Sequence, residues 1–523
     1  MGGAMLQLSL YGSQDVLLTG SPQVTFFRTV YKRFSLFASE AISQTFQGVA
    51  DMGRKCVCPI TRQGDLVTTV WLQVTLPDLS LYQYGTPQTA TSTVPGILSA
   101  RFASSTTAVV KVIPPTDGLS DRYIVTATRT GGVTSEFEGG SGSTSITVTG
   151  LNPTLYSYSV TVRRVKADDT EGSESSSMGI VTLRWCNNVG HALIRSVELS
   201  IGGSLIDRHL GEYMDIVSEL SMPEEKRVGF ETMIGKYPSY DLYDNSFSGA
   251  RTLYIPLQFA FNRSPGLAIP LISLAFHDVV LNFDFRDYTE LIKSNVAISS
   301  LTNERGALPT ADISLWSTFI FLDVEERRRY STQPWEQLIE QVQFLGDNPI
   351  IIDADEPNST RKINLNFSHP VKEIMWVYNP AKSYNLGISP SQYASQGNDY
   401  FNCNLISPYD AEDPIKTAYI QVNGHQRFST RPGSYFRLCV PYMHHTRIPT
   451  KNVYSYSFSL SPEDLHQPSG SINYSRVDTS QLIMALNDNM TTSAYNGRIR
   501  VFATNFQVLR IASGMAGLAF AAS

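Results

Sequence analysis

Apolar and polar side chains alternate along several stretches of this chain, and this period of two restricts its fold more than any other feature. Residues 454–460 read Tyr-Ser-Tyr-Ser-Phe-Ser-Leu, and the same alternation occurs over residues 196–201 and 281–285. Successive side chains of a strand point to opposite faces, so each stretch predicts a strand with one buried face and one polar face. We therefore expect an all-β chain made of packed sheets.

The composition agrees with this expectation and sets the number of domains. The chain has 26 Tyr, 25 Phe and 36 Gly, residue types that favour strands and turns over helices. Its 523 residues are 42% hydrophobic and 17% charged, so it can bury more than one core. Two or three domains are predicted.

The charge balance argues against a nucleic-acid-binding chain. The net charge is −6, whereas wrapping nucleic acid needs a surplus of Lys and Arg. The basic run Arg327–Arg329 directly follows Glu325 and Glu326, so we interpret it as an ion-pair cluster in solvent or at an interface.

The cysteines and histidines carry no metal or catalytic signature. Five cysteines in so long a chain suit a reducing compartment, and Cys56 and Cys58 are expected as buried thiols on one side of a strand. His277 and Asp278 are expected as a hydrogen-bonded structural pair. No zincin, nucleophile-elbow, phosphate-loop or dinucleotide motif is present in the sequence. We predict no catalytic, cofactor-binding or metal-binding residues, and no enzyme.

Neither a secretion signal nor a membrane-spanning segment is recognisable. The amino terminus lacks a basic segment followed by an apolar core, and the apolar tail from Ile511 to Ser523 is too short to span a bilayer. A soluble, cytosolic protein is expected.

Helical periodicity is confined to two short stretches. One places Tyr213, Ile216, Val217 and Leu220 on a single face ahead of Pro223. The other follows Pro334 and places apolar residues on one face in the same way, namely Trp335, Leu338, Ile339 and Val342. Both are predicted to be connecting helices that pack on sheets.

A weak internal repeat links the two halves of the chain. The stretch from Val197 has a strand, a Gly-Gly turn, and then Gly211 and Tyr213. The stretch from Ala418 has a strand, an Asn-Gly turn, and then a Gly and a Tyr at positions 433 and 435. Two related sandwiches would explain the repeat, and chance similarity between hairpins is the alternative.

Between Leu76 and Arg184 the composition shifts to Ser, Thr, Gly and Pro, with short candidate strands. Their size and spacing match an immunoglobulin-like sandwich. The stretch resembles a fibronectin type III domain through residues 146–165, where Leu151, Pro153 and Tyr156 look like a strand entry and tyrosine corner. Two features depart from that pattern: the spacing from Leu151 to Tyr156 is one residue short, and the second-strand Trp is missing.

The rest of the chain resembles the major capsid proteins of nucleocytoplasmic large DNA viruses, the phycodnavirus and mimivirus relatives. The similarity is carried by long ordered segments: LQLSLYGSQDVLLTGSPQVTFFRTVYKRF from Leu6, RQGDLVTTVWLQVTLP from Arg62, HALIRSVELSIGGSLIDRHLGEYM from His191, YSFSLSPEDLHQPSGSINYSR from Tyr456 and VFATNFQVLRIASGMAGLAF from Val501.

This resemblance implies two tandem eight-stranded jelly rolls, with the immunoglobulin or fibronectin-like sandwich inserted in a loop of the first. The expected domains are an amino-terminal segment over 1–25, a first jelly roll over 26–84 and 184–300, an insert over 85–183 on the outer face, and a second jelly roll over 301–523.

The same resemblance implies a structural protein of the outer capsid shell of the virion, assembled in the host cytoplasm. Three copies would form a pseudo-hexagonal capsomer. The implied partners are other copies of the chain, neighbouring capsomers, and minor capsid and penton proteins. The host surface is a further candidate partner, through the insert. A carbohydrate-binding or adhesive surface protein is the alternative, and a single-barrel minor or penton capsid protein is a third hypothesis.

Overall fold

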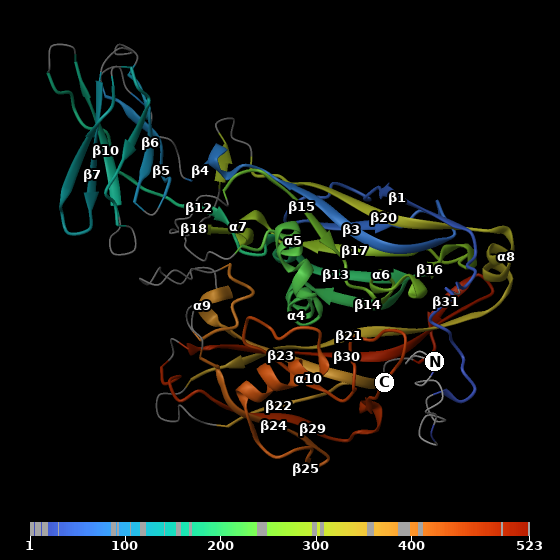
Figure 1. Ribbon diagram of the computed structural model, residues 1–523. Helices are drawn as coiled ribbons and strands as arrows, with labels where there is room; N and C mark the ends of the chain where they lie inside the picture. Colours follow the sequence, from blue (N-terminus) through green and yellow to red (C-terminus); the bar gives the residue numbers. More distant parts are fainter. Residues whose placement is uncertain are drawn as a thin grey trace.

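The structure is a computed structural model of the 523-residue chain. It describes residues 5, 12, 19–29, 31–84, 90, 94–104, 106–115, 122–140, 142–152, 158–166, 170–237, 248–294, 301–303, 308–352, 360–384, 398–405, 412–492 and 495–520. Figure 1 shows two barrels side by side and a separate small sandwich beyond one end of the first barrel.

Two antiparallel sheets enclose one apolar core in the first barrel. The strand order of one sheet is β1 (Phe37–Gln44), β20 (Asp312–Leu322), β3 (Leu66–Leu76) and β15 (Arg251–Pro256). The order of the other is β14 (Ser204–Leu210), β13 (Ile194–Ile201), β17 (Val279–Phe285) and β2 (Lys55–Pro59). Leu199 and Leu281 point into the core, as the alternation predicted.

The second barrel repeats this plan around a core of its own. One sheet has the order β21 (Trp335–Ile350), β30 (Gly497–Ala512), β23 (Pro370–Pro380) and β27 (Val453–Ser457). The other has the order β25 (His425–Gln426), β24 (Ile415–Val422), β29 (Ser480–Leu486) and β22 (Arg361–Asn364). The predicted two-jelly-roll fold is therefore confirmed, because each strand has a counterpart at the same place in the other barrel.

The internal repeat coincides with equivalent hairpins in the two barrels. Gly202 and Gly203 turn the chain between β13 and β14, and Asn423 and Gly424 turn it between β24 and β25. All four residues have positive φ, a conformation that Gly and Asn adopt more readily than other residues.

The glycine that follows each hairpin is required by close packing. A Cβ at Gly211 would lie 2.2 Å from the carbonyl oxygen of His191. A Cβ at Gly433 would lie 2.0 Å from the carbonyl oxygen of Ile415. The shared Gly therefore marks a point where two backbones approach each other in both barrels.

Two expectations from the sequence are corrected. The second barrel does not begin at residue 301, because β20 pairs with β1 and β3 and completes the first barrel up to Leu322. Trp335 to Val342 form no helix, because this stretch is the start of β21 and pairs with β30. The first predicted helix is confirmed as α4 (Gly211–Ser221), and α5 (Glu224–Ile234) follows it directly after Pro223.

The part of the chain between β3 and β13 forms two small sheets. Strands β5 (Gly96–Phe102), β6 (Ala108–Ile113) and β9 (Ser145–Val148) make one of them. The other has the order β11 (Met178–Gly179), β10 (Tyr158–Val165), β7 (Arg122–Arg129) and β8 (Thr134–Glu138). Their buried side chains form a core separate from those of the barrels. Pro153 and Tyr156, which carried the fibronectin resemblance, lie outside the described residues, so that assignment stays a prediction.

Candidate assembly site at the junction of the two barrels

The two barrels meet along an apolar seam that α4 provides. Tyr213, Ile216, Val217 and Leu220 of this helix pack on the outer face of the β23–β27–β30 sheet. The sheet contributes four buried strand residues and one neighbouring cysteine, namely Met375, Val377, Val453, Phe502 and Cys403. The helical periodicity seen in the sequence therefore serves an interface between domains.

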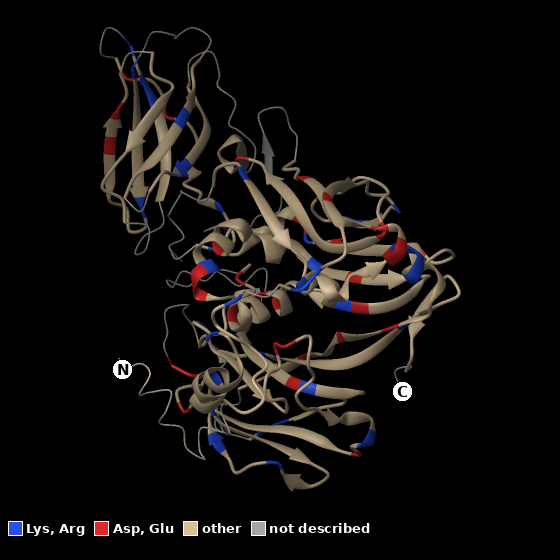
Figure 2. Cartoon of the chain, turned by 45° about the vertical axis from the view of Figure 1, so that its right-hand side comes forward, with Lys and Arg blue, Asp and Glu red and all other residues tan. Residues whose placement is uncertain are grey.

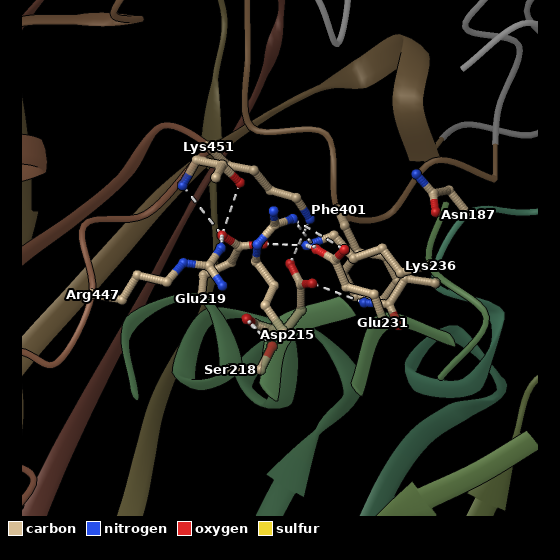
Figure 3. Close-up of polar contacts among 12 residues, drawn as sticks. Asn187, Asp215, Ser218, Glu219, Glu231, Lys236, Phe401, Arg447 and Lys451 are labelled. Carbon is tan, nitrogen blue, oxygen red and sulfur yellow. Dashed lines mark hydrogen bonds and ion pairs between the residues drawn. The ribbon is translucent and has the colours of Figure 1, made fainter. Parts of the chain in front are cut away.

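A cluster of buried ion pairs closes one end of the seam (Figure 3). Asp215 and Glu219 are four residues apart, so they project from the same side of α4 toward the second barrel. Asp215 accepts a hydrogen bond from Lys451 Nζ at 2.9 Å, and Glu219 accepts one from Arg447 at 2.8 Å. Thr450 donates its backbone N–H and its hydroxyl to Glu219, and Lys236 donates to it as well.

The cluster fixes the ionised form of its central carboxylate. Burial raises the pKa of Glu219, but Lys451, Lys236 and Arg447 outweigh that effect and hold the pKa at about 2. The side chain of Glu219 is 1% exposed and that of Arg447 is 9% exposed. Removing Glu219 would take away the carboxylate that the buried cations Arg447 and Lys236 share, which is strongly destabilising.

A second ion-pair chain crosses the junction beside the first. Glu212 of α4 binds Arg286 of the first barrel at 2.8 Å and Arg500 of the second at 3.0 Å. Arg500 also binds Asp347 at 2.7 Å. Burial raises the pKa of Glu212, but Arg286 and Arg500 lower it to about 2. Both barrels therefore contribute residues to this row of ion pairs.

The described residues beside the ion cluster line a pocket whose thiol is not activated. A pocket of about 280 Å³ lies next to the ion cluster and is lined in part by Lys236, Phe401 and Cys403. Burial raises the pKa of the Cys403 thiol to about 12, so this sulfur is no nucleophile at neutral pH. Over the described parts of the chain, no group of three His, Cys, Asp or Glu residues could hold a metal ion.

Two features singled out in the sequence, the Cys56 and Cys58 pair and the basic run, lie apart from this junction. Cys56 and Cys58 lie on β2 and are buried, as predicted. Arg327 lies on the exposed helix α8 (Val324–Thr332) and pairs with Asp65 at 3.1 Å, in agreement with the ion-pair interpretation.

The expected pair of His277 and Asp278 is not formed. The two residues directly precede β17. His277 Nδ1 contacts the backbone of Ala516, and Asp278 binds Arg62 at 2.9 Å. Each side chain therefore has a partner from elsewhere in the chain.

The junction residues were missed because their partners are far apart in the sequence. Glu219 and Arg447 are 228 positions apart, and no local pattern connects them. The available signal was the pair of carboxylates at helical spacing beside the apolar face of α4, Asp215 and Glu219.

The architecture defines a class of viral shell proteins. A quasi-atomic model of the PBCV-1 virus capsid matches 95% of this chain and 100% of the capsid chain, with 26% identity and a TM-score of 0.64. The Faustovirus major capsid protein covers 96% of this chain, with 94% of its own length, 13% identity and a TM-score of 0.62, a likeness in fold. The fold is that of viral double jelly-roll capsid proteins.

The sequence comparisons identify the family. Residues 326–517 match the family model of the large eukaryotic DNA virus major capsid protein, and residues 25–99 and 138–323 match that of the major capsid protein N-terminus. The major capsid protein of Phaeocystis pouchetii virus is 31% identical over 99% of this chain and 100% of its own. That of Paramecium bursaria Chlorella virus 1 is 30% identical over the full length of both.

The chain therefore belongs to the major capsid proteins of large eukaryotic DNA viruses, which form the capsid shell. This family is structural and not enzymatic. Among the described helices, none is long and apolar enough to cross a membrane.

Proposed function

We propose that three copies of this chain form a pseudo-hexagonal capsomer, and that these capsomers tile the outer shell. The observation that carries the proposal is the matching strand order of the two barrels. Two similar barrels in one chain allow three copies to present six similar units around a closed three-fold axis. One gene product can then pave a flat hexagonal lattice.

Electron microscopy of the purified protein tests this proposal directly. Particles with six lobes and three-fold symmetry are expected, with a projecting density on every second lobe because only the first barrel carries the insert. A population of isolated two-lobed particles at micromolar concentration would contradict the capsomer.

We further propose that the capsomer contacts its neighbours, and minor capsid and penton proteins, through the amino-terminal part of the chain. Phe26, Phe27 and Tyr31 are 94%, 98% and 80% exposed, an unusual state for large aromatic side chains. Deleting residues 1–36 should leave capsomers intact but prevent their assembly into shells in infected cells. Normal shells from the truncated chain would contradict this role.

The insert, expected over residues 85–183, is proposed to project outward and to take part in attachment to the host surface. It lies beyond the end of the first barrel in Figure 1 and has its own core. Virions that lack Pro95 to Val181, joined by a short linker, should assemble but adsorb poorly. Unchanged adsorption would contradict the attachment role.

The charge distribution supports a role without direct nucleic-acid contact. Figure 2 shows Lys and Arg interspersed with Asp and Glu over the barrels and the insert. With a net charge of −6, the chain has no excess of cations to neutralise phosphates. Assembly in the host cytoplasm fits the buried, unpaired thiols of four of its five cysteines.

A further inference from the structure

The helix that follows the equivalent hairpin differs in burial between the two barrels. In the first barrel this helix is α4, and all its residues from Gly211 to Leu220 are buried. In the second barrel it is the short π-helix η5 (Tyr435–Cys439), which continues into α10 (Val440–His444). Leu438, Tyr442 and Met443 of this second helix are 39%, 78% and 53% exposed. The second barrel covers α4, whereas the equivalent helix α10 is exposed to solvent.

The sheets of the two barrels also differ in how much of their outer face is buried. Every residue of β23 from Val371 to Pro380 is buried, because the core covers one face and α4 covers the other. Its first-barrel counterpart β3 alternates between buried and more exposed positions. The outer face of the first-barrel sheet therefore has no cover within the described chain.

The uncovered sheet face is rich in aromatic side chains. Trp71 of β3 and Trp316 of β20 are direct neighbours across the two strands. Tyr254 of β15 is 42% exposed and lies opposite Gln73 of β3. Partly exposed Trp and Tyr side chains grouped on one sheet are typical of the centre of a protein interface.

We propose that the η5–α10 helix of one copy packs on the outer face of the β3–β15–β20 sheet of the next copy. The contact would repeat between chains the packing of α4 on β23–β27–β30 within a chain. This inference rests on the capsomer proposed above and names its interface. Because each copy carries one helix face and one sheet face, the contact is heterologous and closes in a ring of three.

Two single substitutions and their mixture test the pairing of the two faces. Tyr442→Glu places a charge on the helix face, and Trp316→Glu places one on the sheet face. Each variant alone should run as a monomer of one chain mass, 57.9 kDa, in light scattering. An equimolar mixture retains one intact helix face and one intact sheet face, so it should form a dimer of two chains and no trimer.

The control substitution is Val133→Glu, which changes an exposed residue of the insert at 50% exposure. It should leave the trimer unchanged, and circular dichroism should show that all three variants are folded. Trimers that persist in both interface variants would overturn the inference and leave the capsomer standing. A monomeric wild-type chain would contradict the capsomer itself.

Thiol labelling provides a test without substitution. Cys439 of η5 is exposed in the single chain, and the other four cysteines are buried. In the wild-type trimer Cys439 should react with a maleimide at least ten-fold more slowly than in the Tyr442→Glu monomer. Equal labelling rates in the two samples would show that η5 stays open in the trimer, and the inference would fail.

Discussion

Strands β23 and β3 occupy equivalent positions in their barrels, yet β23 is buried on both faces and β3 on one. The difference lies in what covers the outer face: α4 of the same chain covers β23. The packing of α4 on β23–β27–β30 within the chain is therefore the template that we infer for the contact between chains.

The largest effect is expected at the centre of the closed seam. Phe502 is fully buried. The centroid of its ring lies 4.8 Å from that of the Phe344 ring and 5.8 Å from that of the Tyr213 ring. Phe502→Ala should lower the free energy of unfolding by about 3–5 kcal/mol, because it removes buried apolar surface and leaves a cavity.

The matched control is Trp316→Ala on the open face, measured by urea unfolding in the monomeric Tyr442→Glu background. Its cost should be smaller, about 1–2 kcal/mol, because Trp316 lies at the surface of the single chain, only partly buried, and its removal leaves no enclosed cavity. Equal losses for the two substitutions would contradict the distinction between a closed and an open face.

The next largest effect on stability is expected at the buried ion cluster. Glu219→Gln removes the carboxylate that Arg447 and Lys236 share, so the free energy of unfolding should fall by about 3 kcal/mol. The control is Glu336→Gln, whose pair with Arg510 is exposed on both sides and should change stability by under about 1 kcal/mol. Urea unfolding at neutral pH measures both, and a neutral Glu219→Gln would contradict the role assigned to the cluster.

The pH dependence of stability should report the same carboxylates. Glu212 and Glu219 have a pKa of about 2 in the folded chain, against an ordinary value of 4.5 for glutamate. Because folding lowers each pKa, their contribution is present above about pH 4.5 and is lost as the pH falls toward 2. The double variant Glu212→Gln, Glu219→Gln should flatten this part of the unfolding-midpoint profile, and an unchanged slope would contradict the assignment.

The smallest effect is expected from removing the insert. Its core is separate from those of the barrels, and Arg101 donates to the carbonyl oxygen of Leu79 as one described link between them. Deleting Pro95 to Val181 should leave the thermal midpoint of the barrels unchanged within error. A shift of more than about 4 °C, the size expected for a loss of over 1 kcal/mol, would show that the insert supports the first barrel.

Much of the fold follows from local patterns, and the errors have physical causes. The alternating stretches at β13 and β17 were placed correctly because one face of each strand is buried and the other is not. The prediction of a helix from Trp335 to Val342 was wrong because β21 lies between the two barrels. Contacts on both of its faces disturb the period of two. Pairing with β30 along its length overrides the helical spacing.

The junction could not be predicted in the same way. The apolar face of α4 was visible, but its partners Met375 and Phe502 belong to the other barrel, and a helix face alone does not identify its receptor. The ion pairs depend on residues that only the fold brings together. The resemblance to capsid proteins supplied the two-barrel plan, and the structure supplied the contacts.

The most direct test of the central claim is the molar mass of the purified wild-type chain, measured by light scattering during size-exclusion chromatography. The proposed capsomer predicts three times the chain mass of 57.9 kDa, constant across the peak at micromolar concentration. A stable monomer at the same concentration would contradict assembly through paired barrel faces, and a monomer that also binds glycans would favour the adhesive alternative.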